Sequence, residues 1–201
     1  MPVYIINIRT RQASNPLPSP HATAAVALRP FAAAPAALRG IRVRVARPAA
    51  ARLVLQYELQ GTLADLRLAD RPASAAPDEP TEELWRHTCM ELFVSQGPPG
   101  PYLEFNLAPS GRWAAYRFSG YRAGMAPLTG IRPPRIELAT HADRLLLSAE
   151  VALPTHLGAG GLRLGLTAVV EDARGALSYW ALAHPGDRPD FHQPDSFGFE
   201  I

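Results

Sequence analysis

The chain has 201 residues, of which 47% are hydrophobic and 19% charged, and its formal net charge is +2. These values indicate one substantial globular domain and exclude a disordered, highly charged chain. Lysine is absent and the arginines are scattered, so there is no basic stripe of the kind that binds nucleic acid. No apolar run approaches the roughly 18 residues that span a bilayer, which argues against a membrane protein. The single cysteine, Cys89, excludes an internal disulfide and a multi-cysteine metal site.

Proline, alanine and serine dominate residues 1–37 and repeatedly interrupt regular structure. We expect residues 1–22 to form a loosely ordered segment and residues 23–201 to form the single domain. The opening MPVYIINIRTRQ has no basic segment before its apolar run and no cleavage site of the A-x-A kind. It therefore predicts no signal peptide, and a cytoplasmic location is expected by default.

Alternation of apolar and polar residues between turn residues predicts β-strands through the rest of the chain. Polar, proline-rich residues 70–81 predict a loop, and the one contender for a helix, residues 153–160, is too short for more than a turn. The expected strands cover residues 41–46, 52–61, 88–94, 102–108, 112–119, 135–140, 144–153, 162–172, 177–184 and 197–201. The fold class is therefore all-β, an antiparallel β-sandwich of about nine or ten strands.

Two central strands, residues 88–94 and 102–108, carry one apolar face and one mixed face. The apolar positions, which should point into the core, are Met90, Leu92, Val94, Leu103, Phe105 and Leu107. The opposite positions are Cys89, Glu91, Phe93, Tyr102, Glu104 and Asn106. Aromatic rings beside carboxylates suit sugar hydroxyls, because rings stack and acids accept hydrogen bonds. The alternative is a half-exposed sheet face on which Glu91 and Glu104 pair with Arg117 or Arg122 across strands.

The next strand and its loop extend this pattern. Trp113, Ala115 and Arg117 share one face, and the alternate positions are Ala114, Tyr116 and Phe118. Arg117 is a candidate for the mixed face. The glycine-flanked loop at 119–125 adds Tyr121 and Arg122, and loops at the ends of sandwiches often carry recognition groups.

Four stretches stand out in combination: LWRHTCMELFV (84–94), YLEFNLAPSGRWAAYRFSGYRAGM (102–125), LSYWALAHPGDRPDFH (177–192) and FGFEI (197–201). Together they resemble the bacterial DOMON-like proteins, which are related to the family 9 carbohydrate-binding modules. The resemblance extends over approximately residues 23–201 and implies a β-sandwich that binds a small ligand, sugar or haem, without chemistry on it.

In the sugar-binding relatives two tryptophans clamp a terminal sugar while polar side chains hold its hydroxyls. Trp85 and Trp180 match those tryptophans in order along this chain. The sequence departs from these relatives in showing no secretion signal, whereas they act on polysaccharide outside the cell. The resemblance therefore points to a saccharide ligand more firmly than to an extracellular glycan.

The haem-binding relatives ligate iron through methionine with histidine or lysine. Lysine is absent here, and Met90 falls on the apolar face of its strand. The remaining pairing would join Met125 to one of His87, His184 and His192. No CxxCH motif for covalent haem is present, and we predict no cofactor.

Acidic and histidine residues gather near the C-terminus, at Asp187, Asp190, His192 and Asp195, with His184 just upstream. Such groups could hold a divalent metal. Aspartates in a Pro/Gly-rich segment also stabilise turns by accepting bonds from backbone amides, and we predict such a loop and no metal site.

The sequence thus predicts a non-catalytic module for a small ligand, a saccharide or a similar polyhydroxylated molecule. The predicted ligand-binding residues are Trp85, Glu91, Tyr102, Glu104, Asn106, Arg117, Tyr121, Arg122 and Trp180. The alternatives are a haem-binding electron-transfer domain and a structural or protein-interaction sandwich. A glycosidase pair of Glu91 and Glu104 is considered, but spacing alone does not indicate one. An open strand edge could also pair with a second copy of the chain.

Overall fold

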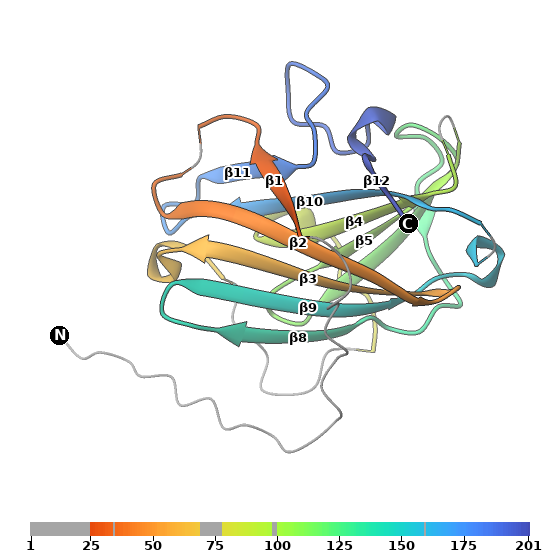
Figure 1. Ribbon diagram of the computed structural model, residues 1–201, viewed down its shortest axis with the longest axis horizontal. Helices are drawn as coiled ribbons and strands as arrows, with labels where there is room; N and C mark the ends of the chain where they lie inside the picture. Colours follow the sequence, from red (N-terminus) through yellow and green to blue (C-terminus); the bar gives the residue numbers. More distant parts are fainter. Residues whose placement is uncertain (1–24, 34, 69–77, 98–99, 159) are drawn as a thin grey trace.

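The computed structural model describes residues 25–33, 35–68, 78–97, 100–158 and 160–201 (Figure 1). The predicted loose segment 1–22 and most of the predicted loop 70–81 lie outside these residues. The strands before residue 120 are β1 (Val26–Pro30), β2 (Leu38–Ala49), β3 (Arg52–Gly61), β4 (Cys89–Ser95), β5 (Tyr102–Leu107) and β6 (Trp113–Phe118). Those after it are β7 (Ala126–Pro127), β8 (Arg135–Thr140), β9 (Arg144–Ala152), β10 (Arg163–Glu171), β11 (Leu177–Ala181) and β12 (Phe199–Glu200).

Single turns of 3-10 helix account for the helical structure of the described residues. They are η1 (Leu63–Asp65), η2 (Leu84–Arg86), η3 (Thr155–Leu157) and η4 (Pro194–Ser196). The turn η3 falls in the segment where the sequence allows one turn. None of the described helices is long and apolar enough to cross a membrane.

All strand pairs are antiparallel, in the order β7-β6-β5-β4-β10-β11-β1-β2-β3-β9-β8, with β12 alongside β10. The sheet curls so that its two ends face each other (Figure 1). We call β2, β3, β9 and β8 the first half-sheet, and β4, β5, β6, β10 and β11 the second half-sheet. The short strand β1 joins them, because Val26–Leu28 pair with β2 and Arg29–Pro30 pair with β11.

The main hydrophobic core fills the space between the two half-sheets. Alternation sends Leu55 and Tyr57 of β3 into it from one side and Leu92 and Phe105 from the other, all with no measurable exposure. The Tyr57 hydroxyl crosses the core to donate a 2.8 Å hydrogen bond to the backbone carbonyl of Glu91. This bond satisfies a buried hydroxyl and fixes β4 relative to β3.

The structure confirms an all-β antiparallel fold and corrects its details. The described residues form twelve strands, more than the nine or ten predicted, and one curled, continuous sheet replaces two separate sheets. All ten predicted strands are present. The two additional ones, β1 and β7, are five and two residues long and contain proline, so their sequences carry little alternation.

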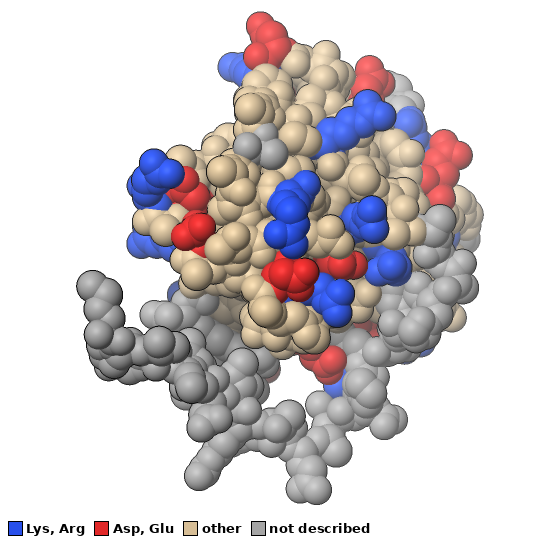
Figure 2. Space-filling view, turned by 60° about the vertical axis from the view of Figure 1, so that its left-hand side comes forward, with Lys and Arg blue, Asp and Glu red and all other residues tan. Residues whose placement is uncertain are grey.

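Acidic and basic side chains lie interspersed on the surface in Figure 2. Outward positions of the first half-sheet contribute cross-strand ion pairs such as Arg44–Glu58 at 3.7 Å and Arg52–Glu150 at 3.6 Å. This surface is what alternation predicts for a sheet with one solvated face.

Candidate functional site

The outer face of the second half-sheet, which points away from the main core, collects the polar residues of the mixed pattern. Strand register places Asn106 opposite Glu91 and Glu91 opposite Thr167. In the next row Glu104 lies opposite Tyr116 on one side and Phe93 on the other. Glu91 and Glu104 are therefore diagonal neighbours on adjacent strands and project from the same face.

A C-terminal loop, residues 182–198, folds back over this face. Phe191 and Phe197 pack with Phe93 and Tyr102 in a second hydrophobic cluster. Close approach of the loop depends on Gly165, because a Cβ there would lie 2.8 Å from Cδ1 of Phe197 and 3.1 Å from Cβ of Phe93. The loop thus buries one part of the outer face and leaves a cavity over the other.

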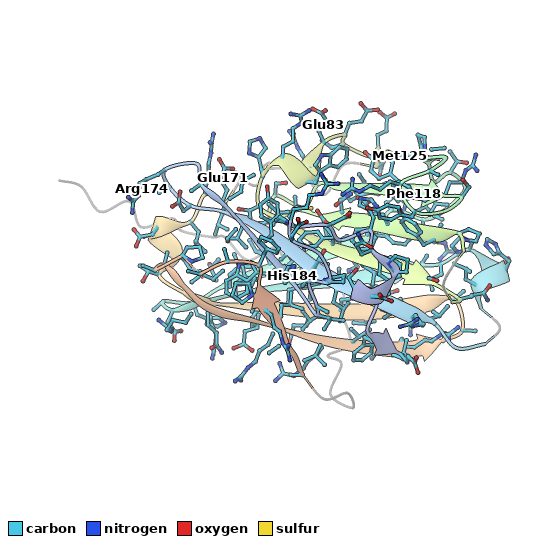
Figure 3. All side chains as sticks on the ribbon, turned by 90° about the horizontal axis from the view of Figure 1, so that it is seen from above. Glu83, Phe118, Met125, Glu171, Arg174 and His184 are labelled. Carbon is cyan, nitrogen blue, oxygen red and sulfur yellow. The ribbon has the colours of Figure 1, made fainter. Side chains whose placement is uncertain are left out.

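The cavity has a volume of about 350 Å³. Its walls come from η2, from strands β4, β5, β6, β10 and β11, and from the loops at 119–125 and 182–198. The lining residues are Trp85, Glu91, Glu104, Phe118, Arg122, Met125, Val169, Tyr179, Pro189, Phe191 and His192. Phe118 and Met125 are labelled in Figure 3, on the same side of the sheet as Glu83, which precedes η2. Four aromatic rings and two carboxyl groups therefore share one small space.

The two carboxyl groups are buried, and each accepts one hydrogen bond from a neighbouring side chain. Thr167 Oγ1 donates to Glu91 Oε2 at 3.2 Å, and Asn106 Nδ2 donates to Glu104 Oε1 at 2.6 Å. Glu91 is 3% exposed and Glu104 is 5% exposed. Burial, followed by repulsion from Glu104, raises the pKa of Glu91 well above its usual range. Burial also raises the pKa of Glu104 to about 7, although Asn106 and Arg122 oppose the shift.

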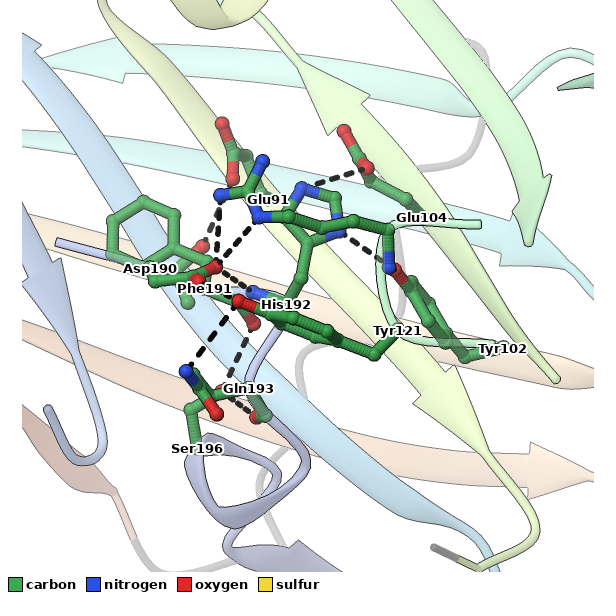
Figure 4. A network of polar contacts seen from close by, with 11 residues as sticks. Glu91, Tyr102, Glu104, Tyr121, Asp190, Phe191, His192, Gln193 and Ser196 are labelled. Atoms are coloured by element: carbon green, nitrogen blue, oxygen red, sulfur yellow. Dashed lines mark hydrogen bonds and ion pairs between the residues drawn. The ribbon is translucent and has the colours of Figure 1, made fainter. Parts of the chain in front are cut away.

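His192 joins the carboxyl pair to Tyr102 (Figure 4). Its Nδ1 lies 2.8 Å from the Tyr102 hydroxyl, and its Nε2 lies 3.9 Å from Glu104 Oε2. The Tyr102 oxygen accepts the backbone N–H of Arg122 at 3.3 Å, which leaves its own proton for Nδ1. Burial, with the Arg122 charge, lowers the pKa of His192 to about 4. We therefore assign a neutral imidazole whose Nε2–H faces Glu104.

Arg122 is fastened to the C-terminal loop by Asp190. The guanidinium donates from Nε at 3.2 Å and from Nη2 at 2.8 Å to Asp190 Oδ1. The Tyr121 hydroxyl donates to Asp190 Oδ2 at 2.5 Å, and the His192 backbone N–H donates to Oδ1 at 3.1 Å. Burial raises the pKa of Asp190, but the bonds from Arg122 and Tyr121 outweigh it and hold that pKa below its usual range. We call this set of contacts of Asp190 with Arg122 and Tyr121 the clasp. It closes one side of the cavity.

Backbone strain accompanies the cavity. Among the described residues, the non-glycine residues with positive φ are Arg122 (φ 50°) and Glu83 (φ 58°). Arg122 lines the cavity, and Glu83 directly precedes η2, which carries Trp85. Strained residues of this kind persist where the surrounding structure holds them, often at ligand sites.

The structure brings most of the predicted ligand-binding residues together. Trp85, Glu91, Glu104 and Arg122 line the cavity. Tyr102 and Tyr121 line an adjoining hollow of about 260 Å³ that shares His192 with it. Asn106 is fully buried beside Glu104 and positions that carboxylate.

Two predicted residues, Trp180 and Arg117, lie outside the cavity lining. Trp180 is 2% exposed in the main core, where its indole N–H donates to Ser178 Oγ at 3.0 Å. Its neighbour Tyr179 faces the cavity instead, because adjacent residues of a strand point to opposite faces. Arg117 projects from the opposite face of β6 to Phe118 and is exposed beside another hollow.

Sequence reasoning missed Tyr179, Phe191 and Pro189 as lining residues. Tyr179 could have been found, because alternation within β11 separates it from Trp180. Phe191 lies in an aperiodic loop, whose course the sequence pattern does not predict.

Of the residues weighed as metal or haem ligands, only some approach the cavity. Met125 and His192 line it, whereas Met90 is in the core and His87 is bonded to Glu171 at 2.7 Å. The described residues contain no group of three or more histidine, cysteine, aspartate or glutamate side chains that could hold a metal ion.

Comparison with solved structures finds the same fold in carbohydrate-binding proteins. A provisionally assigned carbohydrate-binding protein of Bacteroides uniformis matches with a TM-score of 0.58 and 14% identity, over 89% of this chain and 85% of that one. A family 9 carbohydrate-binding module of Caldicellulosiruptor kristjanssonii, solved with cellotriose, matches with a TM-score of 0.56 and 11% identity, over 90% and 82%. No family model and no curated protein matches the sequence. The chain therefore has a fold similar to that of family 9 carbohydrate-binding modules.

Proposed function

We propose that the protein is a non-catalytic binding module for a small saccharide, which it holds in the cavity lined by Trp85, Glu91 and Glu104. The observation that carries this proposal is the combination of aromatic walls with two buried carboxyl groups in one cavity of about 350 Å³. The similarity to carbohydrate-binding proteins supports it at the level of the fold.

The chemistry of the lining suits a sugar. The C–H faces of a pyranose ring are apolar and pack on aromatic rings, and its hydroxyl groups donate to carboxylates. Trp85 and Tyr179 offer half-buried rings, while Glu91 and Glu104 offer acceptors at the sheet surface. The volume lies near the lower end for ligand cavities, which favours a short saccharide over a long polymer segment.

Isothermal titration calorimetry against mono- and oligosaccharides tests the proposal. Trp85→Ala should weaken binding at least about tenfold, since loss of an aromatic anchor commonly removes more than 1 kcal/mol. Phe31→Ala is a matched control, because Phe31 is a half-buried ring that packs on His184 away from the cavity lining. The absence of binding heat with every saccharide, in protein that unfolds cooperatively, would refute the proposal.

Chromatography of the same mixtures tests the non-catalytic part. We expect each oligosaccharide to be recovered intact. Release of shorter sugars that disappears in Glu104→Gln would instead identify Glu91 and Glu104 as a glycosidase pair.

The haem alternative is addressed by the surroundings of His192. Met125 lines the same cavity, but Nδ1 of His192 is bonded to Tyr102 and Nε2 faces Glu104. An iron ligand would need one of these nitrogens to be released. A Soret band in haem-titrated protein that is lost in Met125→Leu would favour haem over a saccharide.

A further inference from the structure

We propose that the saccharide carries a positively charged amino group, and that this ammonium lies between Glu91 and Glu104 against the aromatic walls of the cavity. The inference rests on the proposed function and narrows its ligand class from neutral sugars to amino sugars. Its basis is a pair of buried acids without a cationic partner at the floor of the cavity, combined with the ring arrangement around it.

The first step is that the carboxyl pair has no cationic partner of its own. Glu91 Oε2 accepts from the neutral Thr167 hydroxyl, and Oε1 takes no hydrogen bond from any described residue. Glu104 faces His192 at 3.9 Å, but that imidazole is neutral. The chain contains no lysine that could approach. Glu91 is thus a nearly fully buried carboxyl group that lines the cavity with one oxygen unpaired.

The second step concerns Arg122, the cationic residue that lines the cavity. Asp190 Oδ1 accepts both Nε and Nη2 of its guanidinium. The Arg122 charge is therefore balanced within the clasp. Glu91 and Glu104 line the cavity with this one guanidinium, which Asp190 already pairs, so the lining retains an excess of acidic groups.

A third buried carboxyl group on the same sheet face provides a contrast. Glu171, which is 4% exposed at the far end of β10, receives Arg67 Nη1 at 2.8 Å and His87 Nδ1 at 2.7 Å. It does not line the cavity. Where a buried acid lies outside the cavity, the protein supplies its partners. Where two acids line the cavity, the cation is missing, as expected if the ligand brings it.

An ammonium is also stabilised by aromatic rings, and the walls of the cavity provide them. Trp85, Phe118, Tyr179 and Phe191 approach from η2, β6, β11 and the C-terminal loop. The electron-rich faces of such rings attract cations, most strongly where water is excluded. A neutral hydroxyl could donate the same hydrogen bonds, but it would bring no positive charge to favour ionisation of the two acids. An ammonium supplies three N–H donors and the compensating charge.

Calorimetry with D-glucose, D-glucosamine and N-acetyl-D-glucosamine tests the inference, at a pH below the pKa of the ligand amine. The three share the pyranose ring, and acetylation removes the charge. We expect glucosamine to bind at least about tenfold more tightly than either neutral sugar, since hydrogen bonds to charged groups exceed neutral ones by about 1 kcal/mol or more. This preference should decrease as salt concentration rises.

The variant Glu91→Gln/Glu104→Gln should lose the preference while it still folds, because it removes two buried ionisable acids and keeps the side-chain shape. Glu171→Gln is the matched control and should keep the preference. Thermal unfolding of each variant establishes that it is folded before titration.

The outcomes separate the inference from the proposed function. Equal affinities for glucose and glucosamine, or a preference that survives the double variant, would overturn the amino-sugar inference and leave a neutral saccharide module. Failure of all three sugars alongside binding of tetramethylammonium would overturn the saccharide and retain the ammonium site. Failure of every probe would overturn both.

Discussion

The two half-sheets share one core but differ in the burial of their outer faces. Along β3 and β9 of the first half-sheet, buried positions alternate with partly exposed ones, and the outward residues include Gln56, Glu58 and Glu150. Along β4 and β5 of the second half-sheet, every position is buried, including Glu91 and Glu104. The first half-sheet thus has a single packed face, and the second has two.

Buried polar groups follow the same division. Among the described residues, the buried polar and charged ones are Thr88, Glu91, Ser95, Glu104, Asn106, Ser110, Thr167, Glu171, Asp190 and Ser196. None lies in the first half-sheet or in β1, and the buried Tyr57 hydroxyl of β3 reaches across the core to the Glu91 carbonyl of β4. Because desolvated polar groups are costly unless paired, their confinement to one region points to a specific use of that region. Burial of the second outer face therefore carries an electrostatic cost that the first outer face does not have.

The largest expected loss of stability comes from truncating an aromatic ring on the outer face of the second half-sheet. Phe93 is fully buried against Phe197 and His192, with ring centroids 5.5 and 5.3 Å away. Phe93→Ala should lower the free energy of unfolding by about 3–5 kcal/mol, as for a core phenylalanine. Urea unfolding measures it, and Gln56→Ala, at an outward position of β3, is the control. Similar small losses in both variants would contradict the two-faced packing.

A smaller loss is expected when the contact between β10 and the C-terminal loop is obstructed. In Gly165→Ala the new Cβ would meet Phe197 at 2.8 Å, so the loop must shift, at a cost of about 1–3 kcal/mol. Gly40→Ala is a matched strand control, because a Cβ there meets nothing within 4 Å. Denaturation midpoints compare the two. Equal stability of both variants would show that the loop does not rest on the sheet as described.

As pH rises, the buried acids and the buried histidine should change the free energy of unfolding in opposite directions. Burial raises the pKa of Glu104 from 4.5 to about 7, so the folded state binds more protons, and its contribution to stability falls as pH rises through that window. Burial lowers the pKa of His192 from 6.5 to about 4, so the folded state binds fewer protons, and its contribution is lost as pH falls through that window.

Removal of the acids and removal of the histidine should therefore change stability with slopes of opposite sign, on the order of 2–3 kcal/mol across each window. As pH rises from about 4.5 to 7, Glu91→Gln/Glu104→Gln should become more stable relative to wild type. As pH rises from about 4 to 6.5, His192→Asn should become less stable relative to wild type. Urea midpoints at each pH provide the measurement. Slopes of the same sign in both variants would rule out this assignment.

The smallest effect is expected on the outer face of the first half-sheet. Arg44 and Glu58 form a partly exposed ion pair at 3.7 Å. Arg44→Ala should change the free energy of unfolding by no more than about 0.5 kcal/mol, because solvent screens such pairs. A loss above about 1 kcal/mol would mean that this face also packs against something.

Alternation in the sequence predicted the orientation of β4 and β5 residue by residue. Leu92 and Phe105 lie in the core and Glu91 and Glu104 on the outer face, as their positions indicate. The same rule applied to β11 would have placed Tyr179 rather than Trp180 on the face of the cavity. Trp180 was chosen by resemblance to a sugar clamp, and periodicity would have shown that its side chain points into the core.

Arg117 was misplaced for a related reason. It stands in step with Trp113, whose face belongs to the main core, yet its charge suggested the mixed face. Arg117 is the last but one residue of β6, where it pairs with the two-residue edge strand β7, and its side chain is exposed there. Strand order and sheet margins depend on contacts between distant segments, and local alternation does not report them.

By itself the sequence determined an all-β antiparallel fold, the faces of its central strands and the pairing of aromatic with acidic residues on one of them. It could do so because alternation and turn residues are local properties. Only the tertiary structure decided that this face is covered, since Asp190 reaches Arg122 across 68 residues of sequence and Phe197 packs on Gly165. These contacts arise from an aperiodic loop whose course is set by what it touches. They convert an ordinary strand face into a cavity lined by two buried acids.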